Sequence, residues 1–577
     1  MNDLLNFESK TLWKRWEYFA EVQPNKNAII HWSAEGKSYE WNYRELLETA
    51  NKFSARLNQL GVKKGDVCAI VIRHNQLFYP LYLGIVGIGA IPSVLAYPNP
   101  RLHHEKFQHG LIGMSKRSGL NWIFTERELE RIIRPLIVSR EKINSGLLFP
   151  LDWDIEKSVS PNIQEKLENI RSSIDENDPI LLQHSSGTTG LQKPVILTHK
   201  AILDHVENYG KAINLNNSDV AASWLPLYHD MGLIAAFHLP LASGVTSILI
   251  DPFEWIIAPS ILLDAISKES ATLTWLPNFA YNLMTDKIKA EELENISLDS
   301  LRMLVNCSEQ IRANSHERFH EKFNDIGLNP NTLTTMYAMA ETTLAITQSE
   351  PGKRATEISI DRNAVSQGFI SITDNPKKSK TYVSSGKLID GCKLKIVDER
   401  REEFPKDRVG EIVVSSISMF NGYRNYHEKT AEVLDDGGWF YTGDLGFIYN
   451  DELYVIGRIK DIIIVAGNNI YPEDIEDTLN KIEGIIPGRV IAIGEEEELL
   501  GTEQISVIAE TKLDNEIELR KLSMDIVEVG MTIQVNINKV YLVPPRWLIK
   551  SSSGKPSRKT NKQRVLDNID RNVWSNK

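Results

Sequence analysis

The sequence predicts an α/β fold, with a large N-terminal domain of layered, mostly parallel sheets and helices, a β-rich subdomain, and a small α+β domain at the C-terminus. Two observations predict it. Short β-branched runs alternate with amphipathic stretches through the first two thirds of the chain, which is typical of parallel α/β layers. After about Gly386 the runs become closely spaced strands joined by turns, which indicates a β-rich unit.

In the first part of the chain, we expect strands at 67–72, 122–124, 195–197, 246–250 and 301–306, and helices at 43–60 and 260–268. The stretch 80–97 carries no charge and is near the lower length limit of a membrane span. Pro92 and three glycines interrupt it, so we predict a buried helix at 81–89 followed by a buried strand at 90–96, in place of a transmembrane segment.

Later in the chain, strands are expected at 394–397, 410–414 and 453–456, and a boundary at 457–461. Beyond the boundary, strands at 462–465, 490–493 and 505–510 and a helix from about Pro472 predict a small α+β unit. The domains are therefore predicted as 1–459 and 460–577. The acidic cluster 495–498 is expected in a solvated loop, and the last 32 residues hold nine Lys or Arg against two Asp.

Composition excludes several classes. The 577 residues are 42% hydrophobic and 25% charged, so the chain can bury a core, unlike a collagen-like, disordered or coiled-coil protein. The net charge of −12 disfavours a nucleic-acid binder. The three cysteines form no C-x-x-C pair, which argues against a disulfide framework or a cysteine zinc site and favours the reducing cytoplasm. The N-terminus lacks the basic start and apolar stretch of a signal peptide.

The strongest motif is the loop 185–194, SSGTTGLQKP. Two glycines and four hydroxyl residues give a flexible loop whose backbone N–H groups can face an anion, and Lys193 adds a point charge. It does not match the Walker A pattern G-x-x-x-x-G-K-[ST]. A polar hairpin between two strands is the equal alternative.

Three further strings could carry chemistry. Glu341, in YAMAE, could hold Mg²⁺ against a triphosphate, although a helix-start cap is the more frequent role of such a residue. Asp444, in YTGDLG, could accept both hydroxyls of a ribose, although an Asx turn is favoured for this string alone. His229 and Asp230 form a His-Asp pair, but no serine in a nucleophile-elbow pattern is nearby, so a structural histidine is the alternative.

Together these strings resemble the adenylate-forming superfamily of acyl-CoA synthetases, luciferases and peptide-synthetase adenylation domains. The matching strings run in family order and are SSGTTGLQKPV, LPLYHDMG, YAMAETTLA, YTGDLG, GRIKDIIIVAGNNIYPEDIE and SSSGKPSR. Within the superfamily the chain looks most like the fatty acyl-AMP ligases. It departs from the commoner Y-G-x-T-E string at Ala338 and Ala340. Residues 352–380 resemble the insertion that distinguishes these ligases from CoA ligases; an ordinary surface hairpin is the alternative.

The resemblance implies that ATP and Mg²⁺ activate a carboxylic acid, which attacks the α-phosphate, releases pyrophosphate and leaves an acyl adenylate. Tyr337 would stack on adenine, Asp444 would take the ribose hydroxyls with help from Arg458, and Glu341 with Thr188 would bind the metal. The implied ATP- or AMP-binding residues are Ser185, Ser186, Gly187, Thr188, Thr189, Gly190, Lys193, Asn306, Ser308, Glu309, Tyr337, Ala338, Asp444 and Arg458.

The implied catalytic residues are Lys555, Glu341 and His229, with Lys555 between the acid's carboxylate and the α-phosphate. A lysine there would reduce the repulsion between the two anions that must meet. It would also stabilise the negative charge that the transition state spreads over the phosphoryl oxygens. Lys460 matches the family's hinge, about which the small mobile domain rotates. The expected acyl pocket, for which plain core packing is the alternative, includes Asp230, Met231, Gly232, Phe279, Met339 and Ala340.

The insertion of the family is thought to restrain that rotation and to disfavour CoA. The resemblance therefore implies transfer of the acyl group to the phosphopantetheine arm of an acyl carrier protein. The basic C-terminal tail could dock an acidic carrier or only surround Lys555 with positive potential. Competing functions are a fatty acyl-CoA synthetase, an ATP-binding phosphotransferase and a non-catalytic acyl- or carrier-binding protein. The sequence does not give the acyl chain length.

Overall fold

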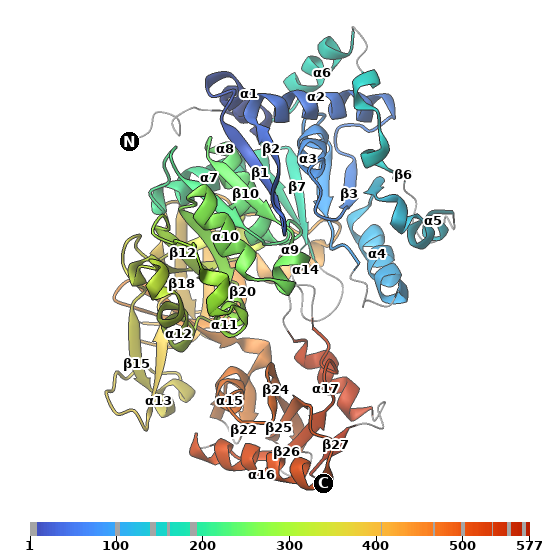
Figure 1. The fold of residues 1–577 in the computed structure, drawn as a ribbon. Coiled ribbons are helices and arrows are strands. Elements are labelled where there is room, and N and C mark those ends of the chain that lie inside the picture. The colour runs from blue at the N-terminus through green and yellow to red at the C-terminus, as the bar shows by residue number, and fades with distance from the viewer. Residues whose placement is uncertain are drawn as a thin grey trace.

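The computed structural model describes residues 9–98, 104–138, 146–158, 162–184, 193–405, 407–465, 468–497, 502–533, 535–550, 556–567 and 573–576. Figure 1 shows a large upper body and a smaller lower part formed by the C-terminal residues. The body contains layered sheets with helices around them, and the lower part combines helices with its own sheet. The α/β class predicted from the sequence is confirmed.

A nine-stranded sheet forms the centre of the body. Its strands are, in spatial order, β17 (Lys387–Leu388), β14 (Ala345–Gln348), β13 (Leu333–Ala338), β12 (Met303–Cys307), β11 (Leu273–Pro277), β9 (Val220–Ser223), β10 (Thr246–Ile250), β1 (Asn27–Ser33) and β2 (Gly36–Asn42). From β13 to β1 every neighbouring pair is parallel, and the edge pairs are antiparallel. All residues of β10, β11 and β12 are buried, which explains why these strands are mostly apolar and do not alternate between apolar and polar residues.

Two smaller sheets lie beside the central one. The parallel sheet contains β4 (Ile91–Val94), β3 (Val67–Val71), β5 (Trp122–Thr125) and β6 (Gly146–Leu148). The strands β7 (Pro179–His184) and β8 (Pro194–Thr198) form an antiparallel pair. The last residue of β7, His184, pairs with the first residue of β8, Pro194.

Helices cover these sheets, and local sequence explains their limits. In α2 (Tyr43–Gln59) the side chain of Asn42 caps the first turn, and Leu46, Ala50, Phe53 and Leu57 form its buried face. The other helices of the body are α1 (Leu12–Val22), α3 (Phe78–Val86), α4 (His104–Ser118), α5 (Glu130–Val138), α6 (Ile163–Ser172), α7 (His199–Ala212), α8 (Leu239–Ala242), α9 (Pro252–Ile257), α10 (Ser260–Glu269), α11 (Asn278–Lys287), α12 (Ala313–Phe323), α13 (Arg362–Ser366) and α14 (His427–Val433).

The β-rich part is an antiparallel sheet of β18 (Cys392–Val397), β19 (Gly410–Ser416), β20 (Phe440–Tyr449) and β21 (Glu452–Arg458). Ahead of it, the predicted insertion forms a hairpin of β15 (Glu357–Asp361) and β16 (Ser379–Val383) with α13 between the strands. A buried cluster joins the hairpin residues Ile360 and Tyr382 to Phe447 of β20 and to Tyr471 of the C-terminal part.

The C-terminal part has a core of its own. It contains the pair β22 (Ile463–Val465) and β23 (Asn468–Ile470) and the sheet β24 (Ile485–Glu497), β25 (Thr502–Thr511), β26 (Ile537–Val543) and β27 (Trp574–Ser575). Its helices are α15 (Pro472–Leu479), α16 (Glu516–Thr532) and α17 (Arg558–Leu566). Between β21 and β22 lies a single 3-10 turn, Ile459–Asp461, where the sequence placed the domain boundary. The division into two domains stays a prediction.

Two local expectations are wrong. Asp444 is not in a turn but inside strand β20, opposite Arg458 of β21. Gly443 takes a positive φ of 72° in that strand, so the string that resembles a turn is an irregular strand. The acidic residues 495–497, predicted in a solvated loop, are in a strand, because β24 continues through Glu497. The carboxylate of Glu495 accepts a hydrogen bond from the Tyr541 hydroxyl.

The uncharged stretch 80–97 contributes to the buried core, as the sequence predicted. It forms the end of α3, all of whose residues are buried, and then the buried strand β4. In the ranges given above, no helix combines the length and the apolarity needed to span a bilayer.

Candidate active site

The predicted site gathers at the carboxyl ends of neighbouring parallel strands, where α/β sheets bind ligands. Asn306 is near the end of β12, Tyr337 near the end of β13, and Glu341 in the 3-10 turn (Ala340–Thr342) that follows β13. Asn278 begins α11 directly after β11. One short segment, 337–341, therefore brings Tyr337 and Glu341 to the same edge of the sheet.

Tyr337, Asp444 and Arg458 form one cluster. The Tyr337 hydroxyl donates to Oδ2 of Asp444 at 2.7 Å, and Arg458 Nε lies 3.1 Å from Oδ1. Burial raises the pKa of the Tyr337 phenol well above its ordinary value, so the hydroxyl keeps its proton at neutral pH and acts as the donor. The Asp444 charge raises the pKa of Arg458. The structure thus brings a carboxylate, a phenol and a guanidinium together from three strands.

Glu341, Tyr423 and Lys193 form a second cluster. The Tyr423 hydroxyl donates to Oε1 of Glu341 at 2.6 Å, and Lys193 Nζ lies 3.4 Å from the same hydroxyl oxygen. Burial raises the pKa of Glu341, while the Tyr423 hydrogen bond and the Lys193 charge lower it. Burial lowers the pKa of Lys193, which the Glu341 charge opposes. A buried carboxylate and an ammonium group therefore flank one phenol where β8 begins.

Asn306 is fully buried at the end of β12. Its Nδ2 donates to Oδ1 of Asn278 at 3.1 Å and lies 2.9 Å from Nε2 of His316, whose pKa burial lowers to about 3. Within the described residues, Oδ1 of Asn306 has no hydrogen-bond partner. A buried acceptor of this kind is unusual in proteins, and a ligand with an N–H donor would satisfy it.

Ser308 and Glu309, two further implied nucleotide-binding residues, contribute to local structure. Ser308 has a left-handed backbone with φ of 72°. The Glu309 carboxylate accepts from the backbone N–H of Phe279 at 2.9 Å, so it caps the start of α11. Ala338, at the end of β13, pairs with Ala345 of β14.

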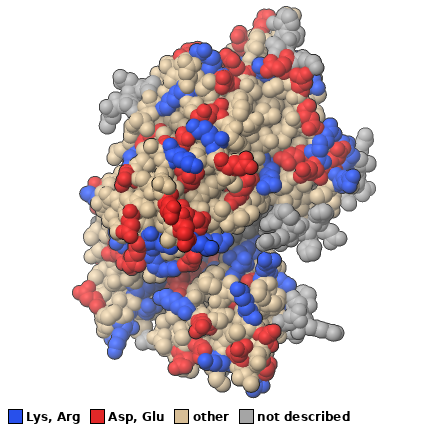
Figure 2. Space-filling model, in the orientation of Figure 1, with Lys and Arg blue, Asp and Glu red and all other residues tan. Residues whose placement is uncertain are grey.

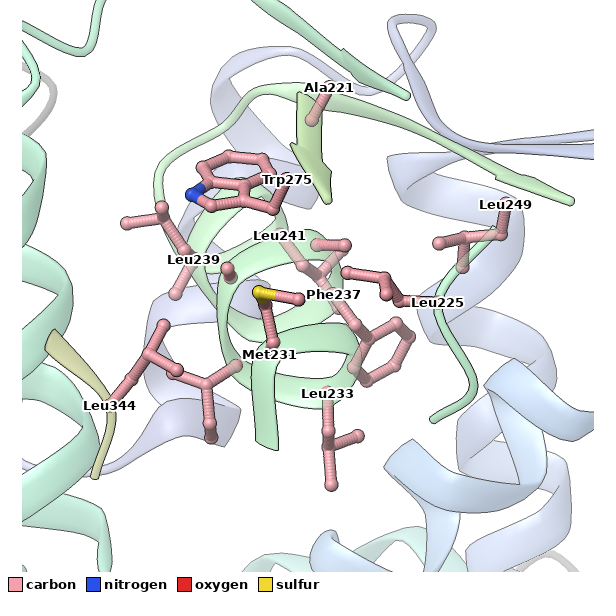
Figure 3. Packing of buried hydrophobic residues seen from close by; sticks show 14 of the residues in the cluster. Ala221, Leu225, Met231, Leu233, Phe237, Leu239, Leu241, Leu249, Trp275 and Leu344 are labelled. Atoms are coloured by element: carbon pink, nitrogen blue, oxygen red, sulfur yellow. The ribbon is translucent and has the colours of Figure 1, made fainter. Parts of the chain in front are cut away.

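The His-Asp pair comes before a π-helix, Met231–His238. His229 Nδ1 lies 2.7 Å from Oδ1 of Asp230, which also accepts from the Met231 backbone N–H at 2.8 Å. A Cβ on Gly232 would lie 2.4 Å from the carbonyl oxygen of Pro226, so only glycine fits there. Figure 3 shows the Met231 side chain among Leu239, Phe237 and Trp275, in the packed core.

Of the other predicted acyl-pocket residues, Phe279 belongs to an aromatic group. Phe279 is half-buried and stands edge-on to Trp224 and Trp255, whose rings stack with centroids 3.6 Å apart. Ala340 is buried and Met339 is half-buried against the main core. The acyl-pocket role of these residues stays a prediction.

The C-terminal part approaches the body through α15. Asp477 of α15 pairs with Arg312, which follows β12, and Asp474 pairs with Lys380 of β16. Figure 2 shows Lys and Arg side chains gathered along the boundary between the two parts. Lys460 is exposed in the 3-10 turn at this boundary.

A second charge cluster joins α15 to the start of α17 and to the turn Ile459–Asp461. Arg558, at the start of α17, pairs with Glu473 and Glu476 at 2.9 Å and with Asp461 at 3.1 Å. The acidic residues of α15 thus point in two directions. Asp474 and Asp477 face the body, and Glu473 and Glu476 face Arg558. The two residues of each pair are three positions apart in the helix, so they lie on one face.

Several predicted site residues lie outside the described residues. They are Ser185, Ser186, Gly187, Thr188, Thr189, Gly190 and Lys555. Sequence reasoning missed Tyr423, Arg312 and the α15 acids. The string FNGYRN around Tyr423 did not attract attention as a motif. The residues that Tyr423 contacts, Glu341 and Lys193, are 82 and 230 positions away in the sequence.

A model of the AMP-binding enzyme family matches residues 16–424, which is well over half of the chain. The chain belongs to the AMP-binding enzyme family. A long-chain fatty acid–AMP ligase from Mycobacterium marinum is 30% identical over 93% of this chain and 94% of its own. A medium-chain fatty acid–acyl-carrier-protein ligase from Moorena producens is 29% identical over 91% and 90%. The family resemblance predicted from the sequence is confirmed.

Solved structures of other AMP-binding enzymes share the fold. A structure from a study of fatty acyl-adenylate ligases of E. coli and L. pneumophila has a TM-score of 0.87 and 25% identity, covering 98% of both chains. The fatty acyl-adenylate ligase of L. pneumophila in complex with acyl adenylate and pyrophosphate has a TM-score of 0.74 and 27% identity, covering 100% of this chain and 99% of its own.

Proposed function

We propose that this AMP-binding enzyme condenses a fatty acid with ATP to give fatty acyl-AMP and pyrophosphate. One observation carries the proposal. The segment 337–341 contributes to two polar clusters, Tyr337–Asp444–Arg458 and Glu341–Tyr423–Lys193, which suit the ribose and the phosphates of one nucleotide. The names of the relatives and of the solved structures support a fatty acid as the second substrate.

The ribose end would use Asp444. Its carboxylate can accept from the ribose hydroxyls while Tyr337 and Arg458 hold its two oxygens in place. Asn306 supports a base next to the ribose, because its unpartnered Oδ1 could accept from an exocyclic amino group. Stacking of the Tyr337 ring on adenine stays a proposal.

The phosphate end would use Lys193 and Glu341. The chemistry of Glu341 fits Mg²⁺, which binds one or two protein carboxylates together with phosphates and water. The carboxylate is buried, and a cation would offset the desolvation that raises its pKa. The described residues contain no group of three or more His, Cys, Asp or Glu side chains that could form an all-protein metal cage. When bound, the ion would neutralise charge on the phosphates.

The chemical step needs the acid's carboxylate to reach the α-phosphorus. A carboxylate oxygen forms a bond to phosphorus while the bond from phosphorus to the pyrophosphate oxygen breaks. Lys193 would balance charge on the leaving pyrophosphate. We assign Lys555 to the meeting of carboxylate and α-phosphate, because its ammonium group offsets the repulsion between the two anions. His229 is proposed to line the acid's approach.

The proposed acceptor is the phosphopantetheine thiol of an acyl carrier protein, with CoA as the alternative. The predicted insertion supports the carrier, since its residue Lys380 pairs with Asp474 of α15. Tyr382, which follows the insertion in β16, belongs to the same buried cluster as Tyr471. These contacts oppose rotation about Lys460, which transfer to CoA would require. A cytoplasmic location stays a prediction.

Two alternatives predict different products. A phosphotransferase would release ADP, and a non-catalytic acyl- or carrier-binding protein would release nothing. The test is pyrophosphate release and acyl-AMP formation across saturated acids of increasing length, with and without CoA. Acyl-AMP with pyrophosphate, and little acyl-CoA, is the expected result. Formation of ADP, or no turnover with any acid, would contradict the proposal.

A further inference from the structure

Tyr423 lies between the two groups proposed to face the phosphates. Its hydroxyl donates to Oε1 of Glu341 at 2.6 Å and is within 3.4 Å of Lys193 Nζ. The same Nζ lies 4.9 Å from the centroid of the Tyr423 ring. One neutral side chain therefore contacts an anion and a cation that would otherwise attract each other directly.

The backbone fixes Tyr423 from both sides. Asn421 N donates to Ile196 O at 3.1 Å and Arg424 N to Pro194 O at 2.9 Å, so the segment 421–424 runs along β8. On the other side, Phe420 N donates to the carbonyl oxygen of Glu341 at 2.8 Å. The residue is 2% exposed. The phenol has little freedom to follow either partner.

This rigidity limits both charged groups. The hydrogen bond to Oε1 opposes rotation of the Glu341 carboxylate, and the ring stands beside the Lys193 ammonium. If the two groups formed a direct ion pair, each would neutralise the other, and neither charge would be fully available to a metal–nucleotide complex. Hydrogen bonds that orient a metal-binding carboxylate typically change metal affinity by about 10- to 100-fold when they are removed.

We propose that Tyr423 is a positioning residue, which holds the carboxylate of Glu341 toward a divalent cation and keeps it apart from Lys193. The proposal rests on the proposed function, because it takes Glu341 as the metal-binding carboxylate. The role assigned to Tyr423 acts through its hydrogen bond to Glu341.

The test is Mn²⁺ binding, followed by electron paramagnetic resonance, in the presence of an ATP analogue with a methylene group between the α- and β-phosphorus atoms. Tyr423→Phe removes one oxygen and keeps the ring. We expect it to weaken Mn²⁺ binding by about 10-fold and to raise the Mg²⁺ concentration for half-maximal pyrophosphate release to a similar extent. The KM of the fatty acid should stay the same. Unchanged Mn²⁺ affinity would overturn the proposal.

Tyr541→Phe is the matched control, because it also removes a phenol that donates to a carboxylate, that of Glu495 at 3.0 Å, in the C-terminal part. It should bind Mn²⁺ like the parent protein. Equal losses in both variants would overturn a specific role for Tyr423.

A double-mutant cycle separates positioning from folding. In the Glu341→Gln background, Tyr423→Phe should cause no further loss of Mn²⁺ affinity, since the carboxylate that it orients is gone. A full additional loss would overturn the proposal. If the parent protein binds Mn²⁺ with the analogue but activates no acid, the proposed function fails, while the comparison of the variants still decides the role of Tyr423.

Discussion

The Tyr337 hydroxyl donates to Oδ2 of Asp444 at 2.7 Å, although 107 residues separate the two side chains. The bond links the central sheet to the β-rich sheet, because Tyr337 is in β13 and Asp444 in β20. The orientation of the Asp444 carboxylate, which is proposed to bind the ribose, therefore depends on Tyr337. The sequence predicted only that the Tyr337 ring stacks on adenine.

Tyr337→Phe should therefore raise the KM of ATP by about 10-fold, which corresponds to the loss of one hydrogen bond to a charged group. The KM of the fatty acid should change little. Steady-state pyrophosphate release at varied ATP measures both. Tyr454→Phe, which removes a phenol 3.4 Å from Glu452, is the control. An unchanged KM of ATP would show that Arg458 alone holds Asp444.

Lys555→Ala should lower the adenylation rate on the order of 10²–10³-fold, as for other lost groups that stabilise transition-state charge. ATP binding, measured by calorimetry, should weaken far less, because the role is assigned to the meeting of the two anions. Lys559→Ala removes an exposed lysine of α17 nearby in sequence and should behave like the parent protein. An unchanged rate in Lys555→Ala would exclude this lysine from the chemical step.

The double variant Arg312→Ala/Lys380→Ala should loosen the C-terminal part. It removes the partners of Asp477 and Asp474, both on α15. We expect a larger radius of gyration in small-angle X-ray scattering and several-fold more acyl-CoA when CoA is supplied. Arg318→Ala, which breaks an ion pair with Asp286 within the body, is the control. The same scattering and the same acyl-CoA yield would show that these pairs do not restrain rotation.

Glu476 should make stability depend on pH. Burial raises its pKa from 4.5 to about 7, against the opposing charge of Arg558. Between these values the folded chain holds a proton that the unfolded chain releases, so this contribution to stability is complete below about pH 4.5 and falls as the pH rises to about 7. Relative to the parent protein, the melting temperature of Glu476→Gln should rise by on the order of a few degrees across this window. A constant difference would contradict the shift.

Gly232→Ala should lower both stability and adenylation, because its Cβ would lie 2.4 Å from a backbone oxygen, that of Pro226. The strain would act next to His229 and Asp230. The matched control is Gly210→Ala in α7, where the new Cβ meets only Leu215 at 3.7 Å; alanine there should stabilise the helix by roughly 0.5–1 kcal/mol. Thermal melting and pyrophosphate release distinguish the two. Equal melting temperatures would contradict the predicted clash.

Some of the buried parallel strands were predictable because they are mostly apolar runs, and β10 matches its predicted limits. The strands β9, β11 and β13 were not predicted. Asp444 was misplaced because Gly443 permits an irregular strand whose local sequence resembles a turn. Among the site residues, Tyr337, Glu341 and Lys193 were found through family strings. Tyr423 was not, since only the fold brings 421–424 beside β8. Local patterns describe neighbours in sequence, and this site depends on contacts between residues 82 to 230 positions apart.

Arg458 both pairs with Asp444 and ends β21, one residue before the turn Ile459–Asp461. On the proposed assignment, a bound ribose shares the carboxylate that anchors this arginine. The nucleotide and the residue next to the turn would thus be joined through the two oxygens of one side chain. The turn could then respond to the arrival and departure of the nucleotide without a separate sensor.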